Sequence, residues 1–393
     1  MYKNNQSEIS TSPKIEQMRH IIIFLLFPYG LLSFSQSKTV YVDNGIRLSH
    51  NEQKMVSGAN IVPLNSKGLC LITYLADNSS SEEIYGKSDD VYVAVQKVHL
   101  NKLRADKYII VARRGMKIGN KLITSIPYNP FIGDNSDKKL VIFEGSIDNQ
   151  SRGLLYRNLC IEKNQIVLDS DISYLKIKYG NNFYNLNIDT YVMILKDKGY
   201  VTSKPGCFVI GLNPRKDKSR TWHMAIGCAP DNYILVLKSK DMYNWEYESI
   251  LPIKGNETDV YYQDDERYYI TRSMNKIYIG ESNSKPRVIE KSVASRPRIF
   301  DLLGDIYIMY NIVDNDYSTE RSTAVISKYH KDGNYKEILK LQRAETIHYY
   351  DMIPYNEKVY IVFSTDANNK LNKIKGELQM IRIPCGKITK SFY

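Results

Sequence analysis

Short apolar runs, each introduced by a polar turn, recur along this chain. Six are clearest, at residues 66–74, 137–144, 231–238, 264–272, 304–310 and 356–364. They are rich in Ile, Val and Tyr, and turn residues bound them, a pattern that predicts β-strands. Four are preceded by a second apolar segment that predicts an antiparallel partner: 61–64, 259–262, 298–300 and 352–354.

Regularly spaced units of this kind favour an all-β protein, either a β-propeller or a sandwich. Their spacing in the C-terminal half fits one four-stranded blade each, so the sequence predicts a six-bladed β-propeller. A five-bladed propeller is the alternative, because residues 160–202 are difficult to assign to a blade. Within them, 174–179 and 191–195 are expected to form a further hairpin, and no segment shows sustained helical periodicity.

The first 37 residues differ from the rest and are expected to be an N-terminal extension with a secretory signal peptide. Met18-Arg19-His20 is basic, Ile21 to Leu32 is apolar, and residues 33–37 offer small side chains for cleavage. The apolar part is short for a membrane span, so no span is expected after cleavage. Residues 38–393 are then a single propeller domain, and the protein is expected to be secreted, periplasmic or at the cell surface.

Composition adds a basic balance and an excess of tyrosine. The formal net charge is +11, and there are 32 Tyr against 10 Phe. A basic exported protein suits anionic glycans or a membrane surface. The lysines are scattered, which argues against a nucleic-acid partner. Tyrosine favours strands and packs well in sheets, and a glycan-binding surface would draw on the same residue type.

Cysteine and histidine spacing indicates no metal or cofactor site. The five cysteines are far apart, without any CxxC pair. His223 and His348 have no second ligand at a recognisable spacing. A phosphate-binding glycine loop and a Ser-His-Asp site are also unsupported. We therefore expect no metal and no cofactor; the oligomeric state is not predicted.

The residues that suggest chemistry lie in the C-terminal half, beside the strand-like runs. They are Glu257, Arg272, the segment Ser295-Arg296-Pro297-Arg298, Arg321 and Tyr349. Guanidinium groups bind carboxylates in bidentate geometry. A tyrosine beside a glutamate can serve as a covalent nucleophile. If the fold brings these residues together, they suggest a site for an acidic sugar.

From about Asp231 to Pro384 the chain resembles the sialidase superfamily. Glu257 to Arg272 is similar in order and spacing to the blade of that family that begins with a glutamate and ends in an arginine. Arg321 precedes a strand and a turn at Asp332-Gly333, and Tyr349-Tyr350-Asp351-Met352 resembles the start of the family's final blade. The segment 239–245 is similar to a degenerate Asp-box, which in the family is a structural turn remote from catalysis.

The resemblance implies a secreted glycoside hydrolase that acts on terminal, acidic sugars of extracellular glycans. Tyr349 would be the nucleophile, with Glu257 accepting its proton. Arg272 and Arg321 would bind the substrate carboxylate. Arg298 is an alternate member of this clamp, and Arg296 a weaker one. Asp90 would be the acid/base, with Asp77 and Asp89 as substitutes.

One departure from the family pattern leaves other functions open. The first blade of the family carries an arginine in an Arg-Ile-Pro motif, where this chain reads Ala59-Asn60-Ile61-Val62-Pro63. Arg47 or Arg113 could replace it in space. The alternatives are a non-catalytic propeller that binds glycan or protein, and a five-bladed glycosidase that uses only carboxylates: Asp90, Glu144 and Glu257.

Overall fold

A computed structural model describes most of the chain. The described residues are 38–42, 45–53, 55–78, 90–135, 138–203, 206–210, 212–282, 284–313, 322–330, 332–343, 346–365 and 376–389. Residues 38–393 form one compact unit. The predicted signal peptide, Asp89 and Arg321 lie outside the described residues.

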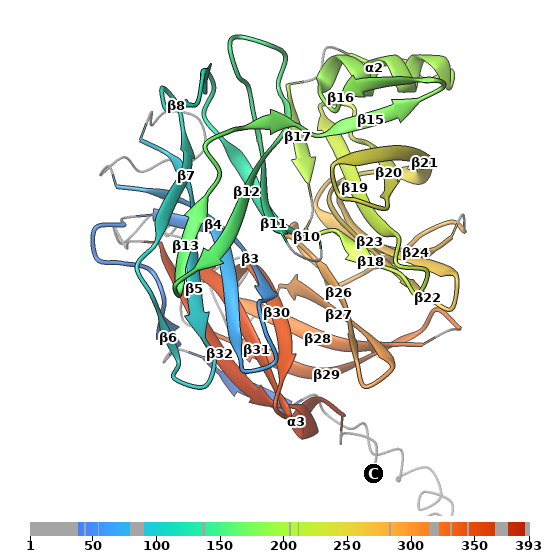
Figure 1. The fold of residues 1–393 in the computed structure, drawn as a ribbon. Helices are drawn as coiled ribbons and strands as arrows, with labels where there is room; N and C mark the ends of the chain where they lie inside the picture. Colours follow the sequence, from blue (N-terminus) through green and yellow to red (C-terminus); the bar gives the residue numbers. More distant parts are fainter. Residues whose placement is uncertain are drawn as a thin grey trace, which may run out of the picture. The chain divides into compact units, whose positions relative to one another are not determined.

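Six sheets, built mainly from antiparallel pairs, form a ring, which confirms the predicted six-bladed propeller (Figure 1). In each blade the first strand is innermost. The strands of blades 1 to 3, with their additional pairings, are as follows. Blade 1 contains β3 (Met55–Pro63), β4 (Leu69–Asp77), β5 (Tyr92–His99), β6 (Arg104–Ala105) and β7 (Ile109–Arg113); blade 2 contains β10 (Tyr128–Asn135), β11 (Lys138–Gly145), β12 (Gly153–Glu162), β13 (Gln165–Leu168) and β14 (Ser173–Tyr174); blade 3 contains β17 (Cys207–Ile210), β18 (Arg215–Lys216), β19 (Trp222–Ala229), β20 (Tyr233–Ser239), β21 (Asn244–Lys254), β15 (Lys176–Tyr179) and β16 (Asn182–Asn185).

Blades 4 to 6 are more regular, and the N-terminal part of the domain completes two of them. Blade 4 contains β22 (Asn256–Gln263), β23 (Glu266–Ser273), β24 (Lys276–Glu281) and β25 (Arg287–Ile289); blade 5 contains β26 (Arg298–Leu302), β27 (Asp305–Ile312), β28 (Thr323–Tyr329) and β29 (Tyr335–Gln342); blade 6 contains β30 (His348–Tyr355), β31 (Lys358–Thr365) and β32 (Glu377–Pro384). The strand β1 (Lys38–Tyr41) pairs with β29, and β2 (Ile46–Arg47) pairs with β32. These pairings join the two ends of the domain and close the ring.

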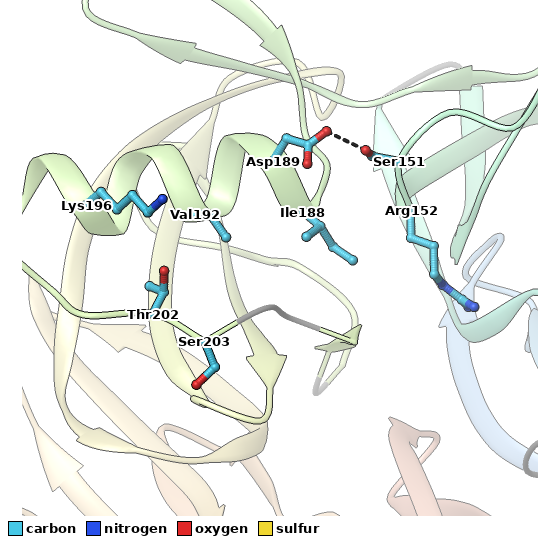
Figure 2. Close-up of a pocket in the computed structure, with 8 residues that line it drawn as sticks. All are labelled: Ser151, Arg152, Ile188, Asp189, Val192, Lys196, Thr202 and Ser203. Atoms are coloured by element: carbon cyan, nitrogen blue, oxygen red, sulfur yellow. Dashed lines mark hydrogen bonds between the residues drawn. The ribbon is translucent and has the colours of Figure 1, made fainter.

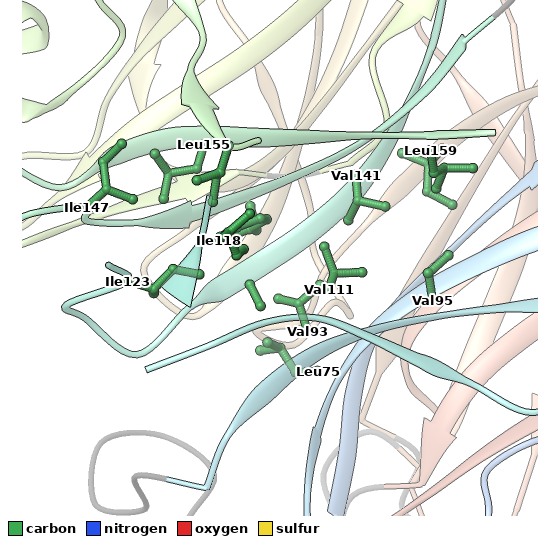
Figure 3. Packing of buried hydrophobic residues seen from close by; sticks show 14 of the residues in the cluster. Leu75, Val93, Val95, Val111, Ile118, Ile123, Val141, Ile147, Leu155 and Leu159 are labelled. Carbon is green, nitrogen blue, oxygen red and sulfur yellow. The ribbon is translucent and has the colours of Figure 1, made fainter. Parts of the chain in front are cut away.

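The hydrophobic core lies between neighbouring blades. Figure 3 shows the layer between blades 1 and 2, where Leu75 and Val93 face Val141 and Leu155. A short hairpin, β8 (Lys117–Ile118) with β9 (Lys121–Leu122), adds Ile118 to the same layer. Many tyrosines are also core residues, since Tyr74, Tyr269 and Tyr307 are fully buried. Much of the tyrosine excess therefore serves packing.

Residues 191–195 were predicted as a strand, and the structure corrects this. They belong to α2 (Ile188–Asp197), while the neighbouring hairpin forms at β15 and β16. Asn187 caps the helix by accepting a hydrogen bond from the Thr190 N–H at 3.0 Å. Tyr191, Ile194 and Leu195 are buried at helical spacing, so packing outweighs the strand preference of this β-branched run. A second short helix, α3 (Cys385–Thr389), follows blade 6.

The Asp-box-like segment forms the turn between β20 and β21, as expected. Ser239 Oγ accepts a hydrogen bond from the Met242 N–H at 2.9 Å, and Asp241 accepts one from the Asn244 N–H at 2.7 Å. The Trp245 side chain is fully buried and donates to the Met242 carbonyl at 2.9 Å. Because β17, β19, β20 and β21 run in alternating directions, this turn lies at the end of blade 3 that is opposite the start of β17.

Candidate functional site

The innermost strands of four blades share one irregularity. In blades 1, 2, 4 and 6 the pairing between the first two strands shifts register at one place. There the first strand advances by three residues while the second advances by two, and the extra residue forms a β-bulge. One residue of each bulge has a positive φ: Gly58 (71°), Asn129 (46°), Glu257 (50°) and Tyr349 (46°). We call these four residues the bulge positions. They occupy equivalent places at the same end of their blades.

Two bulge positions hold residues that strongly disfavour this backbone conformation. Positive φ is uncommon outside glycine and asparagine, and it is a genuine outlier for a bulky residue such as tyrosine. Such a residue costs on the order of 1–3 kcal/mol and persists when its surroundings fix it, most often at functional sites. The predicted base Glu257 and the predicted nucleophile Tyr349 are therefore held in matching, strained positions on blades 4 and 6.

Glu257 is paired with the predicted carboxylate-binding residue Arg272. Arg272 Nη1 lies 3.1 Å from Glu257 Oε2, and the Glu257 residue is only 8% exposed. The Arg272 side chain stays partly accessible, and its buried Nε has no hydrogen-bond partner among the described residues. The pair therefore offers a cation with unused hydrogen-bonding capacity beside a carboxylate.

Tyr349 lies next to another cation, Arg296. The Arg296 guanidinium is 5.6 Å from the centre of the Tyr349 ring, within the range of a cation–π contact. Arg296 Nη1 is also 3.9 Å from the point where a Cβ on Gly58 would lie. Arg296 is 2% exposed and comes from the segment before β26. An arginine of blade 5 thus reaches the bulge positions of blades 6 and 1.

The pKa of the next residue, Tyr350, links blade 4 to this group. Tyr350 is fully buried, and its pKa is raised, first by that burial and further by the negative charge of Glu257. The positive charge of Arg298 acts on this pKa in the opposite direction. The Glu257 carboxylate is therefore close enough to influence the start of blade 6.

Arg298 lies beneath the bulge positions, in a buried ionic network. Its Nη1 is 3.3 Å from Asp259, and its Nη2 is paired with Asp351. Asp259 also accepts from the Ile299 N–H, and Asp351 from the Ile61 N–H, both at 2.8 Å. The guanidinium is therefore committed to two carboxylates that also bind backbone groups of neighbouring blades.

Blade 3 completes this network. Arg215 binds Asp259 through two contacts, of 3.0 and 3.3 Å. Asn213 donates to Asp351 at 3.2 Å and accepts from the Ile132 N–H at 2.9 Å. First-strand segments of all six blades are thus connected by polar contacts. The network supports the ring and leaves Arg298 little capacity to bind a substrate.

The acid/base candidates lie at the same end of blade 1. Asp77 ends β4 and is completely buried, whereas Asp90 is exposed immediately before β5. Of the arginines considered as replacements for the missing one, Arg47 pairs with Glu377 at 3.2 Å and Arg113 is exposed on β7. Arg47 is therefore bound to blade 6 and Arg113 is on an outer strand of blade 1. The arginine that contacts the Tyr349 ring is Arg296.

Blade 2 has a different arrangement around its bulge position. Asn129 donates to Glu144 at 3.2 Å and to the Phe208 carbonyl at 3.0 Å, so both amide hydrogens are used. Glu144 is completely buried and also accepts from Arg152 at 2.8 Å. Burial raises the pKa of Glu144 to about 7, although Arg152 opposes the shift. Glu144 is therefore enclosed by protein groups, which argues against a direct role as a catalytic carboxylate.

Sequence reasoning missed Arg296 as a neighbour of Tyr349, and it missed Asn129. A signal was present, because three segments before or within a first strand share an X-Pro-X pattern: Asn129-Pro130-Phe131, Asn213-Pro214-Arg215 and Arg296-Pro297-Arg298. The residue before proline is biased toward extended backbone or a turn. Aligning these segments with Glu257 and Tyr349 would have identified Asn129 and Arg296.

Among the described residues, no group of three or more His, Cys, Asp or Glu side chains is arranged to hold a metal ion. In the same part of the chain, neither helix has the length and apolar character that crossing a membrane requires.

Comparison with solved structures finds similar propellers. Trypanosoma rangeli sialidase in complex with the inhibitor DANA matches with a TM-score of 0.58 at 10% identity, over 91% of this chain and 59% of that chain. The same enzyme in complex with sialic acid matches with a TM-score of 0.54 at 10% identity, over 90% and 58%. Phage phi92 endosialidase matches with a TM-score of 0.52 at 9% identity, over 88% and 70%.

The fold is therefore that of a sialidase-like β-propeller. This chain spans less than two thirds of the length of the Trypanosoma rangeli sialidase chains that it matches. No protein-family model and no curated protein sequence matches it.

Proposed function

We propose that this protein is a retaining glycoside hydrolase that removes terminal acidic sugars from glycans. The observation that carries the proposal is the pair of strained bulge positions, Glu257 and Tyr349, each with an arginine beside it. Arg272 contacts Glu257, and Arg296 contacts the Tyr349 ring. Known sialidases of the same fold make an acidic sugar the first substrate class to test.

In the proposed reaction the Tyr349 oxygen attacks the anomeric carbon while Glu257 takes the phenolic proton. A phenol with an ordinary pKa of about 10 is a poor nucleophile near neutrality, so it requires such a base. The glycosidic bond breaks, and Asp90 donates a proton to the departing oxygen. Water, deprotonated by Asp90, then attacks the anomeric carbon, and the released Tyr349 oxygen recovers its proton from Glu257.

Three arginines would bind the substrate carboxylate. Arg272 and Arg321 keep the roles that the sequence suggests. Arg296 replaces Arg298 as the third, because Arg298 is bound to Asp259 and Asp351 whereas Arg296 lies against Tyr349 and Gly58. A charge-assisted hydrogen bond of this kind contributes about 1.5–3 kcal/mol.

The proposal is tested by assaying the release of an aryl alcohol from an aryl sialoside. The parent protein should turn the substrate over, and Tyr349→Phe should lose activity while keeping its thermal unfolding temperature. Tyr350→Phe is a matched control, since it removes a neighbouring buried hydroxyl. Equal turnover by the parent and Tyr349→Phe would remove Tyr349 from the mechanism.

A non-catalytic glycan-binding propeller is the second candidate. Gly58 supports it, because the bulge position of blade 1 carries no side chain that could bind a ligand. Binding of sialylated glycans by a parent protein that cleaves neither acidic nor neutral aryl glycosides would favour this function.

We also propose that the protein is exported, on the basis of the basic, apolar and small-residue order of residues 18–37. Mass spectrometry of the mature protein from its native host would locate the N-terminus. A start near residue 38 is expected, and a retained segment 18–37 would contradict cleavage.

A further inference from the structure

A cleft of about 500 Å³ lies alongside α2, separate from Glu257 and Tyr349. It is lined by residues before β12, one side of α2 and the segment that follows the helix (Figure 2). The residues that matter for its chemistry are Arg152, Ile188, Asp189, Val192, Lys196 and Ser203. The volume is in the range of ordinary small-molecule sites.

Contacts connect one side of the cleft with the bulge position of blade 2, Asn129. Ile188 N–H donates to the Arg152 carbonyl at 2.9 Å, and this anchors the start of α2 beside blade 2. The Arg152 side chain binds Glu144 at 2.8 Å, and Glu144 binds Asn129 at 3.2 Å. Arg152 directly precedes β12 at the end of blade 2 where Tyr128 pairs with Glu144, so the cleft and the bulge position of this blade lie at the same end of the propeller.

The lining combines two cations with an apolar strip. Lys196 is exposed and makes no ion pair with any described residue, and Arg152 lies near the other end of the helix. Ile188 and Val192 face the cleft between them (Figure 2). Ile188 and Lys196 are eight residues apart, so the strip is about 12 Å long. That length is enough for about two sugar units.

The charge balance of the lining favours an anion. Asp189 is hydrogen-bonded by the Ser151 hydroxyl. The lining holds two cations, Arg152 and Lys196, against one carboxylate, Asp189. Arg152 is paired with the buried Glu144 at 2.8 Å, so Lys196 is the cation of the lining that remains for a ligand. Cationic groups beside an apolar strip match a sugar ring that presents a C–H face and carries a carboxylate.

We propose that this cleft binds the inner units of an oligosaccharide made of carboxylate-bearing sugars. The inference rests on the proposed function, because the terminal sugar of the same chain would occupy the bulge positions. Lys196 pairs with the carboxylate of an inner unit, and Ile188 with Val192 supports its apolar face. The protein would then prefer longer acidic chains to single acidic sugars.

Calorimetric titration with a hexamer of sialic acid and with free sialic acid tests this preference. All proteins carry Tyr349→Phe, so that the hexamer is not consumed. The parent should bind the hexamer about tenfold more tightly than the monomer. Lys196→Gln, or Val192→Asp as an independent variant, should reduce that ratio toward one without changing monomer affinity.

Lys102→Gln is the matched control. It removes the same charge from an exposed residue in the turn after β5, at the opposite end of a blade. Equal ratios in the parent, Lys196→Gln and Val192→Asp would overturn the inference. If the monomer does not bind but hexamer binding still depends on Lys196 and not on Lys102, the cleft is supported and the proposed function fails.

Discussion

The first strands of blades 4 and 6 and those of blades 1 and 2 have the same bulge but carry different side chains. Blades 4 and 6 place Glu257 and Tyr349 at positive φ, where these residues are costly. Blades 1 and 2 place Gly58 and Asn129 there, which tolerate the conformation well. The bulge therefore belongs to the fold. Among the four bulge positions, the costly residues are on the side where the side chains suggest chemistry.

The partners of the bulge positions sharpen this contrast. In blade 4 the second strand contributes the cation Arg272 beside a carboxylate, whereas in blade 2 the equivalent residue is the carboxylate Glu144 beside an amide. In blade 1 the bulge position is Gly58, which has no side chain. Arg296 from blade 5 lies beside it. Repetition of a backbone motif has thus allowed each blade to acquire a separate role.

Glu257→Gln should have the largest effect on catalysis among the charged residues. The amide cannot accept the phenolic proton, so kcat for an aryl sialoside should fall by about 10²–10⁴-fold. Asn129→Ala, at the equivalent position of blade 2, should reduce kcat much less. Similar losses of kcat in Glu257→Gln and Asn129→Ala would contradict the division of the bulge positions into a reactive pair, in blades 4 and 6, and a supporting pair, in blades 1 and 2.

The buried network beneath both sides should matter for stability rather than for chemistry. Arg298→Met leaves Asp259 and Asp351 without their shared cation and should lower the free energy of unfolding by about 3–5 kcal/mol. Chemical denaturation monitored by Trp fluorescence would measure the change. A variant with parental stability and weakened sugar binding would return Arg298 to the substrate clamp.

Arg296→Met tests whether blade 5 compensates for Gly58. The loss of one charge-assisted contact should raise KM for an acidic sugar by about 10–100-fold, with a smaller effect on kcat. Gly58→Arg in the same protein should restore part of the affinity at a cost in stability, because the φ of 71° at this position strains any side chain. An unchanged KM in Arg296→Met would show that the cation only packs against Tyr349.

The sequence predicted the fold class well because its signals are local and repeated. Strand runs and turns identify blades without any long-range information, and the spacing of Glu257, Arg272 and Tyr349 indicated which blade starts carry them. The helix α2 was predicted wrongly because Tyr191-Val192-Met193-Ile194-Leu195 has strong strand preference. Its Asn187 cap and its buried i, i+3, i+4 positions were the contrary signals.

The candidate site was less predictable because it depends on contacts between blades. Nothing in the local sequence indicates that Arg296 approaches Gly58, more than 230 residues earlier. Likewise, Arg298 and Arg296 are two residues apart and look equivalent in the sequence. One lies in the ionic network and the other beside Tyr349, because Arg298 is the first residue of β26 whereas Arg296 precedes the strand in an irregular segment before Pro297.

The last stability prediction concerns pH and blade 2. Burial raises the Glu144 pKa to about 7 in the folded state, above its ordinary value of about 4.5. The folded protein therefore holds this proton more tightly than the unfolded chain, and the resulting stabilisation is lost as pH rises from about 4.5 to 7. Glu144→Gln should flatten the dependence of unfolding free energy on pH in that interval. A parental slope would contradict the shift.

Covalent trapping tests the central claim most directly. A 2,3-difluoro analogue of sialic acid slows breakdown of a glycosyl-enzyme, so intact-mass and peptide-mapping spectrometry can locate the attached sugar. We predict one adduct per chain, on Tyr349, that is absent in Tyr349→Phe and greatly slowed in Glu257→Gln. Attachment to another residue would contradict the account, as would turnover of an aryl sialoside without any adduct on Tyr349.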